Sequence, residues 1–120
     1  MIDKRVNSVD EAIHGLFDGA TLMVSGFGGA GVPVELIKAL DRSQITDLNI
    51  VINAVRFLEM HAPGLFQDHR VKSLVCSAFR GRDRDPSHYE RQWQAGELAI
   101  DLSPQGSFSE RIRAGGAGIP

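Results

Sequence analysis

The chain has 120 residues, 42% of them hydrophobic and 23% charged, with a formal net charge of -2. These values fit one ordinary globular domain. Because basic residues are scattered apart from the stretch between Arg80 and Arg84, we expect no nucleic-acid partner. The single cysteine, Cys76, excludes an internal disulfide and a cysteine-based metal cluster, and we predict no metal site.

The sequence carries no membrane-targeting feature. No apolar run reaches the roughly 20 residues that a membrane span requires. The first six residues contain no apolar stretch of signal-peptide length. We therefore expect a cytoplasmic protein with no membrane partner.

Helix-like and strand-like segments alternate along the chain. In order, the pattern predicts a helix over 8–16, a strand over 21–25, a helix over 33–40, a strand over 47–52, a strand over 71–77, a helix over 87–95, a strand over 98–102 and a helix over 107–113. Residues 53–68 favour helix but are interrupted by Pro63-Gly64, and 80–86 is predicted to be a charged loop. This alternation predicts a layered α/β domain with an open, mainly parallel sheet flanked by helices.

Two of these segments carry more specific expectations. Ser8 and Glu11 have the spacing of a capping box at the start of the first helix. The strand over 21–25 is almost continuously apolar, which is typical of a strand covered on both faces.

The most distinctive local pattern is the strand, glycine loop and helix between residues 21 and 40. Backbone N–H groups in such a loop, together with the positive end of a helix dipole, can hold an anion. Gly26, Gly28 and Gly31 also match the dinucleotide-binding spacing G-x-G-x-x-G. That fingerprint requires an acidic residue at the end of the next strand, whereas Asn53 follows that strand here. A tight strand-to-helix turn with no ligand would need the same glycines.

Amide side chains follow two of the predicted strands. Asn53 comes directly after the second strand, and Gln105 comes shortly after the fourth. Ligands of open α/β sheets bind at the carboxyl ends of the strands, and amides offer neutral hydrogen bonds to a carbonyl or carboxylate. Each amide alone is more often a turn former or a cap. Because the glycine loop, Asn53 and Gln105 recur at the same end of the sheet, we predict a binding site there.

Histidine, cysteine and serine side chains are weaker candidates. The four histidines have no metal-ligand spacing and are expected at the surface or at helix ends. Cys76 lies within an apolar strand and is expected to be a buried, inert thiol. Ser25 ends a strand but lacks the G-x-S-x-G context of a nucleophile elbow.

The segment from Asp18 to Pro33 resembles a signature of family I coenzyme A transferases, found in the first of their two subunits. That signature is Asp-Gly, a hydrophobic strand, Gly-Gly-Phe, three residues, Gly, one residue and Pro. Further matches in the same order are Ala95-Gly-Glu-Leu98, Pro104-Gln-Gly106 and the stretch from Glu110 to Pro120. The likeness covers the whole chain and implies that residues 1–120 form a single, partial domain of that family's α/β fold.

The resemblance implies a ping-pong transfer of coenzyme A from an acyl-CoA to a free carboxylic acid. In this family a glutamate of the second subunit forms an acyl anhydride and then a thioester with coenzyme A. The Ser-Glu-Asn-Gly type of motif around that glutamate is absent from this sequence. We therefore predict no catalytic residue in this chain, the second coenzyme A transferase subunit in the role of partner, a coenzyme A thioester as substrate, and no permanently bound cofactor.

The same resemblance assigns the chain the role of a substrate cradle. The glycine loop would border the acyl pocket, and the two amides would face the substrate carboxylate or the reacting carbonyl, where neutral donors stabilise developing negative charge. The predicted substrate-binding residues are Gly26, Phe27, Gly28, Gly29, Gly31, Asn53, Gln105 and Gly106.

The chain departs from the family pattern at several places. Ser25 replaces the first glycine of Gly-Gly-Phe, as in some 3-oxoadipate enzymes. Ile52-Asn-Ala-Val-Arg56 stands where the family has Ser-Asn-Asn-Ala-Gly, so one asparagine and a glycine turn are missing. Residues 55–70 and the loop from Arg80 to Arg84 also differ. The glycine loop, the opening residues and Val75-Cys-Ser77 favour 3-oxoadipate, an acid of aromatic catabolism, as acceptor from succinyl-CoA, with acetoacetate next.

The first subunit of this family continues beyond the Gly-Ile-Pro at position 120. The domain is therefore expected to be truncated, to expose apolar surface, and to be unstable or self-associating. Two alternatives stay open, namely a non-catalytic remnant of the first subunit, and a small nucleotide-binding module built on the glycine loop.

Overall fold

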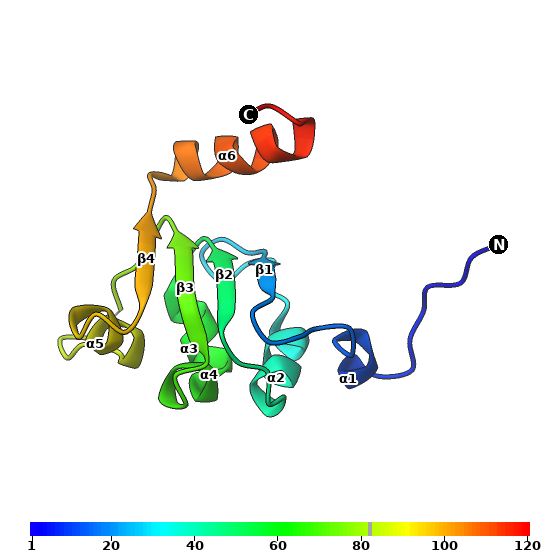
Figure 1. Cartoon of the computed structure of the whole chain (residues 1–120), viewed down its shortest axis with the longest axis horizontal. Coiled ribbons are helices and arrows are strands. Elements are labelled where there is room, and N and C mark those ends of the chain that lie inside the picture. Colours follow the sequence, from blue (N-terminus) through cyan, green and yellow to red (C-terminus); the bar gives the residue numbers. More distant parts are fainter. Residues whose placement is uncertain (82) are drawn as a thin grey trace.

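Four strands and six helices make up the part of the chain that the computed structural model describes, which is residues 1–81 and 83–120 (Figure 1). The strands are β1 (Thr21–Val24), β2 (Leu48–Ile52), β3 (Val71–Cys76) and β4 (Ala99–Leu102). The helices are α1 (Val9–Ala12), α2 (Val34–Arg42), α3 (Val55–His61), α4 (Pro63–Gln67), α5 (His88–Gln94) and α6 (Gln105–Ala117). All four predicted strands are confirmed to within one residue at each end.

The sheet is parallel throughout, and its strands lie in sequence order, β1-β2-β3-β4. Parallel neighbours need crossover connections, and these are right-handed. Because every crossover leads to the next strand in the same direction, α2, α3, α4 and α5 lie on one face of the sheet (Figure 1). The predicted α/β class with a mainly parallel sheet and flanking helices is confirmed.

The hydrophobic core lies between these helices and one face of the sheet. In β2, Leu48, Ile50 and Ile52 are buried, while Asn49 and Val51 are only partly covered. This alternation follows from the two-residue period of side chains along a strand. The core is completed by Ile37, Leu40, Val55, Leu58, Leu65, Phe66, Leu74 and Cys76.

The other face of the sheet is largely open, so the prediction that the strand over 21–25 is covered on both faces is wrong. Met23 is 61% exposed. The strand register places Met23, Val51 and Val75 in one row across this face, and we call this row the open face. All crossovers lie on the opposite side, and of the described residues only α6 approaches the row, where Phe108 and Ile112 form a shared groove with it.

Helix bounds differ from the prediction more than strand bounds do. The Ser8 hydroxyl caps α1 by accepting from the Glu11 amide at 3.1 Å. The predicted capping box is only half formed, because the Glu11 carboxylate accepts from the Asn7 N–H and not from that of Ser8. The helix has only four residues and buries none of them. Residues 53–68 contain two short helices, α3 and α4, with Pro63 at the start of the second. The predicted loop over 80–86 includes Arg82, which lies outside the described residues.

The last helix is longer than predicted and starts earlier. The helix α6 begins at Gln105 rather than Ser107 and continues through Gly115 and Gly116, ending at Gly118 with a left-handed φ of 68°. It crosses the carboxyl ends of the strands (Figure 1). Within the described residues, no helix combines the length and apolar character needed to cross a membrane.

Candidate functional site

Four polar or glycine-rich segments meet at the carboxyl end of the sheet. The glycine loop follows β1, Asn53 follows β2, Ser77 follows β3 and Gln105 follows β4. Parallel strands in sequence order place these positions side by side. The sequence predicts three of the four as site residues, and Ser77 only as the end of a strand.

The glycine loop is a small hairpin. Phe27 and Ala30 exchange two backbone hydrogen bonds of 2.9 and 3.0 Å. Gly28 and Gly29 between them have φ values of 58° and 90°, as a two-residue turn with left-handed central residues requires. The backbone N–H groups of Phe27 and Ala30 are therefore bonded within the loop and do not form an anion cradle.

Ser25 stabilises the base of this hairpin. Its hydroxyl donates to the Gly31 carbonyl oxygen at 2.9 Å. The residue that replaces a glycine of the family signature therefore contributes a bond that closes the loop. Ser25 has a structural contact here and no base beside it, in agreement with the absence of a nucleophile elbow.

The side chains of Asn53, Ser77 and Gln105 form one hydrogen-bond network. Asn53 Nδ2 donates to Ser77 Oγ at 2.7 Å and also to Gln105 Oε1. Ser77 Oγ donates in turn to Gln105 Oε1 at 2.7 Å. Gln105 Nε2 donates to Ser109 Oγ at 3.1 Å. The two amides that the sequence predicted to lie together are thus joined, through a serine that it did not single out.

A cleft of about 310 Å³ lies between the glycine loop and α6. Its lining includes Gly26, Phe27, Asn53 and Gln105 together with Phe108 of α6. Phe27 is 68% exposed, so an aromatic ring borders the opening. The cleft pairs apolar walls with two amides, a composition that suits a small organic acid or acyl group.

No residue that lines this cleft has an ionisable side chain. The amides therefore keep their hydrogen-bonding character at every pH of interest. Among the described residues, no group of three or more histidine, cysteine or acidic side chains could hold a metal ion. The lining residues can bind and orient a substrate, and none of them carries a carboxylate, imidazole or thiol group.

The sequence matches the family model described as coenzyme A transferase over residues 6–120. It is 38% identical over 119 residues to the first subunit of 3-oxoadipate CoA-transferase from Pseudomonas putida, covering 99% of this chain and 51% of that protein. It is 42% identical over 110 residues to the mitochondrial succinyl-CoA:3-ketoacid coenzyme A transferase 2 of Homo sapiens, covering 92% of this chain and 20% of that one. A crystal structure of a variant of the decarboxylase AibA/AibB aligns with a TM-score of 0.71 at 24% identity, covering 94% of this chain and 44% of that one, and supports the fold alone.

The chain belongs to the coenzyme A transferase family. It spans about half the length of the bacterial relative and a fifth of the human one. The family resemblance drawn from the sequence is confirmed, and so is the likeness to the first subunit.

The predicted residues outside the cleft have other surroundings. The site prediction named four glycines that do not line it, namely Gly28, Gly29, Gly31 and Gly106. Gly29 packs closely against the Phe57 ring, and a Cβ there would lie 3.2 Å from Phe57 Cε1. Gly106 is the second residue of α6, with open space beside it. Gly31 supplies the carbonyl that Ser25 bonds.

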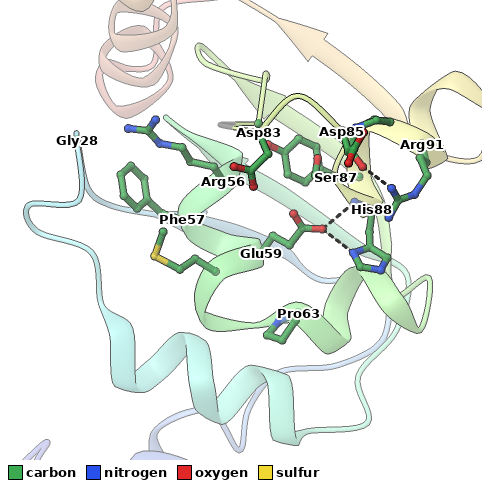
Figure 2. A pocket seen from close by; sticks show the side chains of 14 residues that line it. Gly28, Arg56, Phe57, Glu59, Pro63, Asp83, Asp85, Ser87, His88 and Arg91 are labelled. Atoms are coloured by element: carbon green, nitrogen blue, oxygen red, sulfur yellow. Dashed lines mark hydrogen bonds and ion pairs between the residues drawn. The ribbon is translucent and has the colours of Figure 1, made fainter.

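Gly28 borders a second and larger cavity of about 940 Å³ (Figure 2). Arg56 and Glu59 of α3 and His88 of α5 also line it. His88 lies at a helix end, as predicted, but its backbone N–H donates to Glu59 Oε1 at 2.9 Å and its Nδ1 lies 3.1 Å from the same oxygen. Several of its lining residues, among them Arg56 and Glu59, lie in segments that the sequence analysis found to differ from the family pattern.

The core beneath the site contains two buried ionisable groups. Burial raises the pKa of the Cys76 thiol to about 11 and that of the Tyr89 hydroxyl to about 12. Both side chains are fully buried, so Cys76 is the inert thiol that the sequence predicted. The Tyr89 hydroxyl has no hydrogen-bond partner within residues 1–81 and 83–120. Tyr89 packs between Phe66 and Phe79, with ring centroids 5.5 and 5.3 Å away.

Proposed function

We propose that this chain is the substrate-binding half of the first subunit in a transferase that moves coenzyme A from succinyl-CoA to a 3-oxoacid. The observation that carries the proposal is the neutral cleft in which Asn53 and Gln105 meet beside the glycine loop. An amide donor at this place would bind an oxygen atom of an acyl group or carboxylate without titrating. Membership of the family supports the reaction class.

The nucleophile in this proposal belongs to the second subunit. Its glutamate would attack the thioester carbonyl, releasing coenzyme A as a thiolate and forming an acyl anhydride. The thiolate would then attack the glutamyl carbonyl, releasing the acid and leaving an enzyme thioester, and the second acid would reverse these steps. The uncharged lining of the cleft supports this division of roles, because it contains no carboxylate.

We propose 3-oxoadipate as the preferred acceptor and acetoacetate as the next. The sequence of the glycine loop and the likeness to a 3-oxoadipate CoA-transferase support this order. The Ser25 hydroxyl, which bonds Gly31 at 2.9 Å, is the local feature that accompanies the 3-oxoadipate-like loop. We also propose that the enzyme acts in aromatic catabolism and is located in the cytoplasm.

The direct test is co-expression of the chain with a second subunit of the family, followed by assays with succinyl-CoA and each of the two acids. A full-length first subunit, expressed with the same partner, is the positive control. Transfer to 3-oxoadipate at a higher kcat/KM than to acetoacetate is the expected result. Transfer to acetoacetate alone would contradict the acceptor assignment, and no transfer to either acid beside an active control would contradict the function.

One alternative is a non-catalytic remnant of the first subunit. The observation that favours it is the segment Ile52-Asn-Ala-Val-Arg56, which lacks one asparagine and the glycine turn of the family pattern. The remnant would still bind the second subunit and show no transfer. Co-purification of an inactive pair, beside an active full-length control, would support it.

A nucleotide-binding module is less well supported. The G-x-G-x-x-G spacing falls in a hairpin whose Phe27 and Ala30 N–H groups bond each other's carbonyl oxygens, and an amide rather than an acid follows β2. Saturable binding of NAD by the chain alone would favour this module over the transferase.

A further inference from the structure

Ser77 lies between the two amides of the cleft. The order of the strands places it at the end of β3, with Asn53 at the end of β2 on one side and Gln105 after β4 on the other. It is the one residue among those described whose side chain bonds both amides.

The hydrogen bonds of Ser77 set the direction of the network. A hydroxyl has one hydrogen to donate, and that hydrogen points to Gln105 Oε1 at 2.7 Å, with the Asn53 carbonyl oxygen farther away at 3.3 Å. Ser77 Oγ therefore accepts from Asn53, and it does so from Nδ2 at 2.7 Å. If one amide alone were turned over, two donors or two acceptors would face each other, so Ser77 couples the orientations of the two amides.

A second asparagine–serine pair on the same strands shows that Gln105 affects the direction of the Asn53–Ser77 hydrogen bond. Asn49 and Ser73 lie four residues earlier on the same two strands, and there the serine donates to Asn49 Oδ1 at 2.7 Å. At the carboxyl end of the strands the bond runs the opposite way, from asparagine to serine. Because the serine hydrogen is donated to Gln105 in this structure, Ser77 Oγ accepts from Asn53, and the asparagine presents its NH₂ group.

The orientation of the two amides determines which of their N–H groups remain available to a ligand. Both N–H groups of Asn53 are bonded, to Ser77 and to Gln105. Gln105 Nε2 gives one N–H to Ser109, and its second N–H has no acceptor within residues 1–81 and 83–120. Because Gln105 lines the cleft, a directed donor for an acyl or carboxylate oxygen is left over.

We propose that Ser77 is a positioning residue, which holds the Asn53 and Gln105 amides so that an N–H of Gln105 stays available to an oxygen of the bound acid. The assignment rests on the proposed function for the identity of that acid. Ser77 itself does not line the cleft and has no chemical step. Its effect passes through the two amides.

The first test reads the amides directly and needs neither partner nor substrate. The chain contains three asparagines and five glutamines, so side-chain amide NMR signals of ¹⁵N-labelled protein can be assigned one by one. We expect Ser77→Ala to shift the signals of Asn53 and Gln105 and to speed their exchange with water about tenfold, the factor that one lost hydrogen bond allows. Ser73→Ala is the matched control and should shift only Asn49.

Two further variants keep the test decisive. Ser77→Thr retains the hydroxyl and should preserve both signals. Ser77→Cys keeps the size and provides only a weak donor, so it replaces Ser77→Ala if the alanine variant fails to fold. Signals of Asn53 and Gln105 that remain at their wild-type positions in the alanine or cysteine variant would overturn the proposal.

The second test uses the active assembly of both subunits. Ser77→Ala should raise the KM of the acid about tenfold with kcat within about twofold, because a ligand contact is weakened rather than a reacting group removed. Ser77→Thr should restore the KM, and Ser73→Ala should leave it unchanged. An unchanged KM in Ser77→Ala would overturn the link to the acid. If the wild-type assembly has no activity, the proposed function fails while the amide spectra still decide the role of Ser77.

Discussion

At the scale of single residues, the glycine loop depends on the absence of a side chain at Gly26. Its φ is +121°, and a Cβ there would lie 2.5 Å from Val32 Cγ2. Gly28 also has a positive φ, of +58°, but nothing lies within 4 Å of a Cβ at that position. Both glycines of the loop thus have a backbone conformation that favours glycine, and at Gly26 the lack of space for a side chain is a second constraint.

We predict that Gly26→Ala destabilises the chain by about 2 kcal/mol, because both the backbone conformation and the Val32 contact become unfavourable. Gly28→Asn is the control and should cost less than about 0.5 kcal/mol, since asparagine tolerates the left-handed region. Urea unfolding followed by circular dichroism measures both. Equal losses in the two variants would mean that space at Gly26 is not limiting.

Cys76 and Tyr89 make the stability of the folded chain depend on pH in the alkaline range. Their folded-state pKa values are raised by burial, from 9.0 to about 11 and from 10.0 to about 12. Between pH 9 and 12 the folded chain therefore binds more protons than the unfolded chain, and stability falls as pH rises. We expect the urea midpoint to be constant up to about pH 9 and to fall above it. The Cys76→Ala and Tyr89→Phe double variant should flatten this fall, and an equally steep fall would assign it to other groups.

At the scale of elements, Arg70 fixes the end of α2 against the rest of the fold. Its side chain is buried and donates to the carbonyl oxygens of Leu40, Asp41 and Ile45, each at 2.8 Å. Carbonyl groups at the end of a helix have no partners within the helix. The guanidinium therefore joins α2 to the start of β3 without any carboxylate partner among the described residues.

We predict that Arg70→Met costs about 3 kcal/mol, because the Asp41 and Ile45 carbonyl oxygens lose the guanidinium donor and the Leu40 carbonyl oxygen keeps only its bonds from Ser43. Arg42→Met removes an arginine of the same region that forms an exposed ion pair of 3.0 Å with Asp10, and it should cost less than about 1 kcal/mol. Thermal and urea unfolding of both variants provide the comparison. A small loss for Arg70→Met would show that water replaces the guanidinium.

Some of these elements could be predicted from the sequence and others could not. The strands could be located within one residue because each is a short, mainly apolar run, and in β2 isoleucine and valine dominate it. The extent of α6 was missed because Gly115 and Gly116 suggest a loop, yet the helix continues through them. Asn53 and Gln105 could be paired because both follow strands of a parallel sheet. Ser77 could not, since its role depends on strand order and on the direction of one hydroxyl.

At the scale of the whole molecule, the fold covers its sheet on one side only. The strand order places α2 to α5 on one face (Figure 1), and the row of Met23, Val51 and Val75 meets only α6 among the described elements. The groove between this row and Phe108 of α6 has a volume of about 490 Å³. Exposed apolar surface of this kind promotes association.

We predict that the 120-residue chain self-associates through the open face and that Met23→Glu weakens this association at least about tenfold, since a charge would replace a buried methionine at the contact. Leu36→Glu is the matched control, because Leu36 is 42% exposed on α2, away from the open face. Sedimentation velocity over a range of concentrations measures the association of all three proteins. Equal weakening by Leu36→Glu would place the contact on the helices instead. A monomer at every concentration with one cooperative melting transition would mean that four strands covered on one side suffice for a stable fold, and that the exposed row is tolerated as ordinary surface.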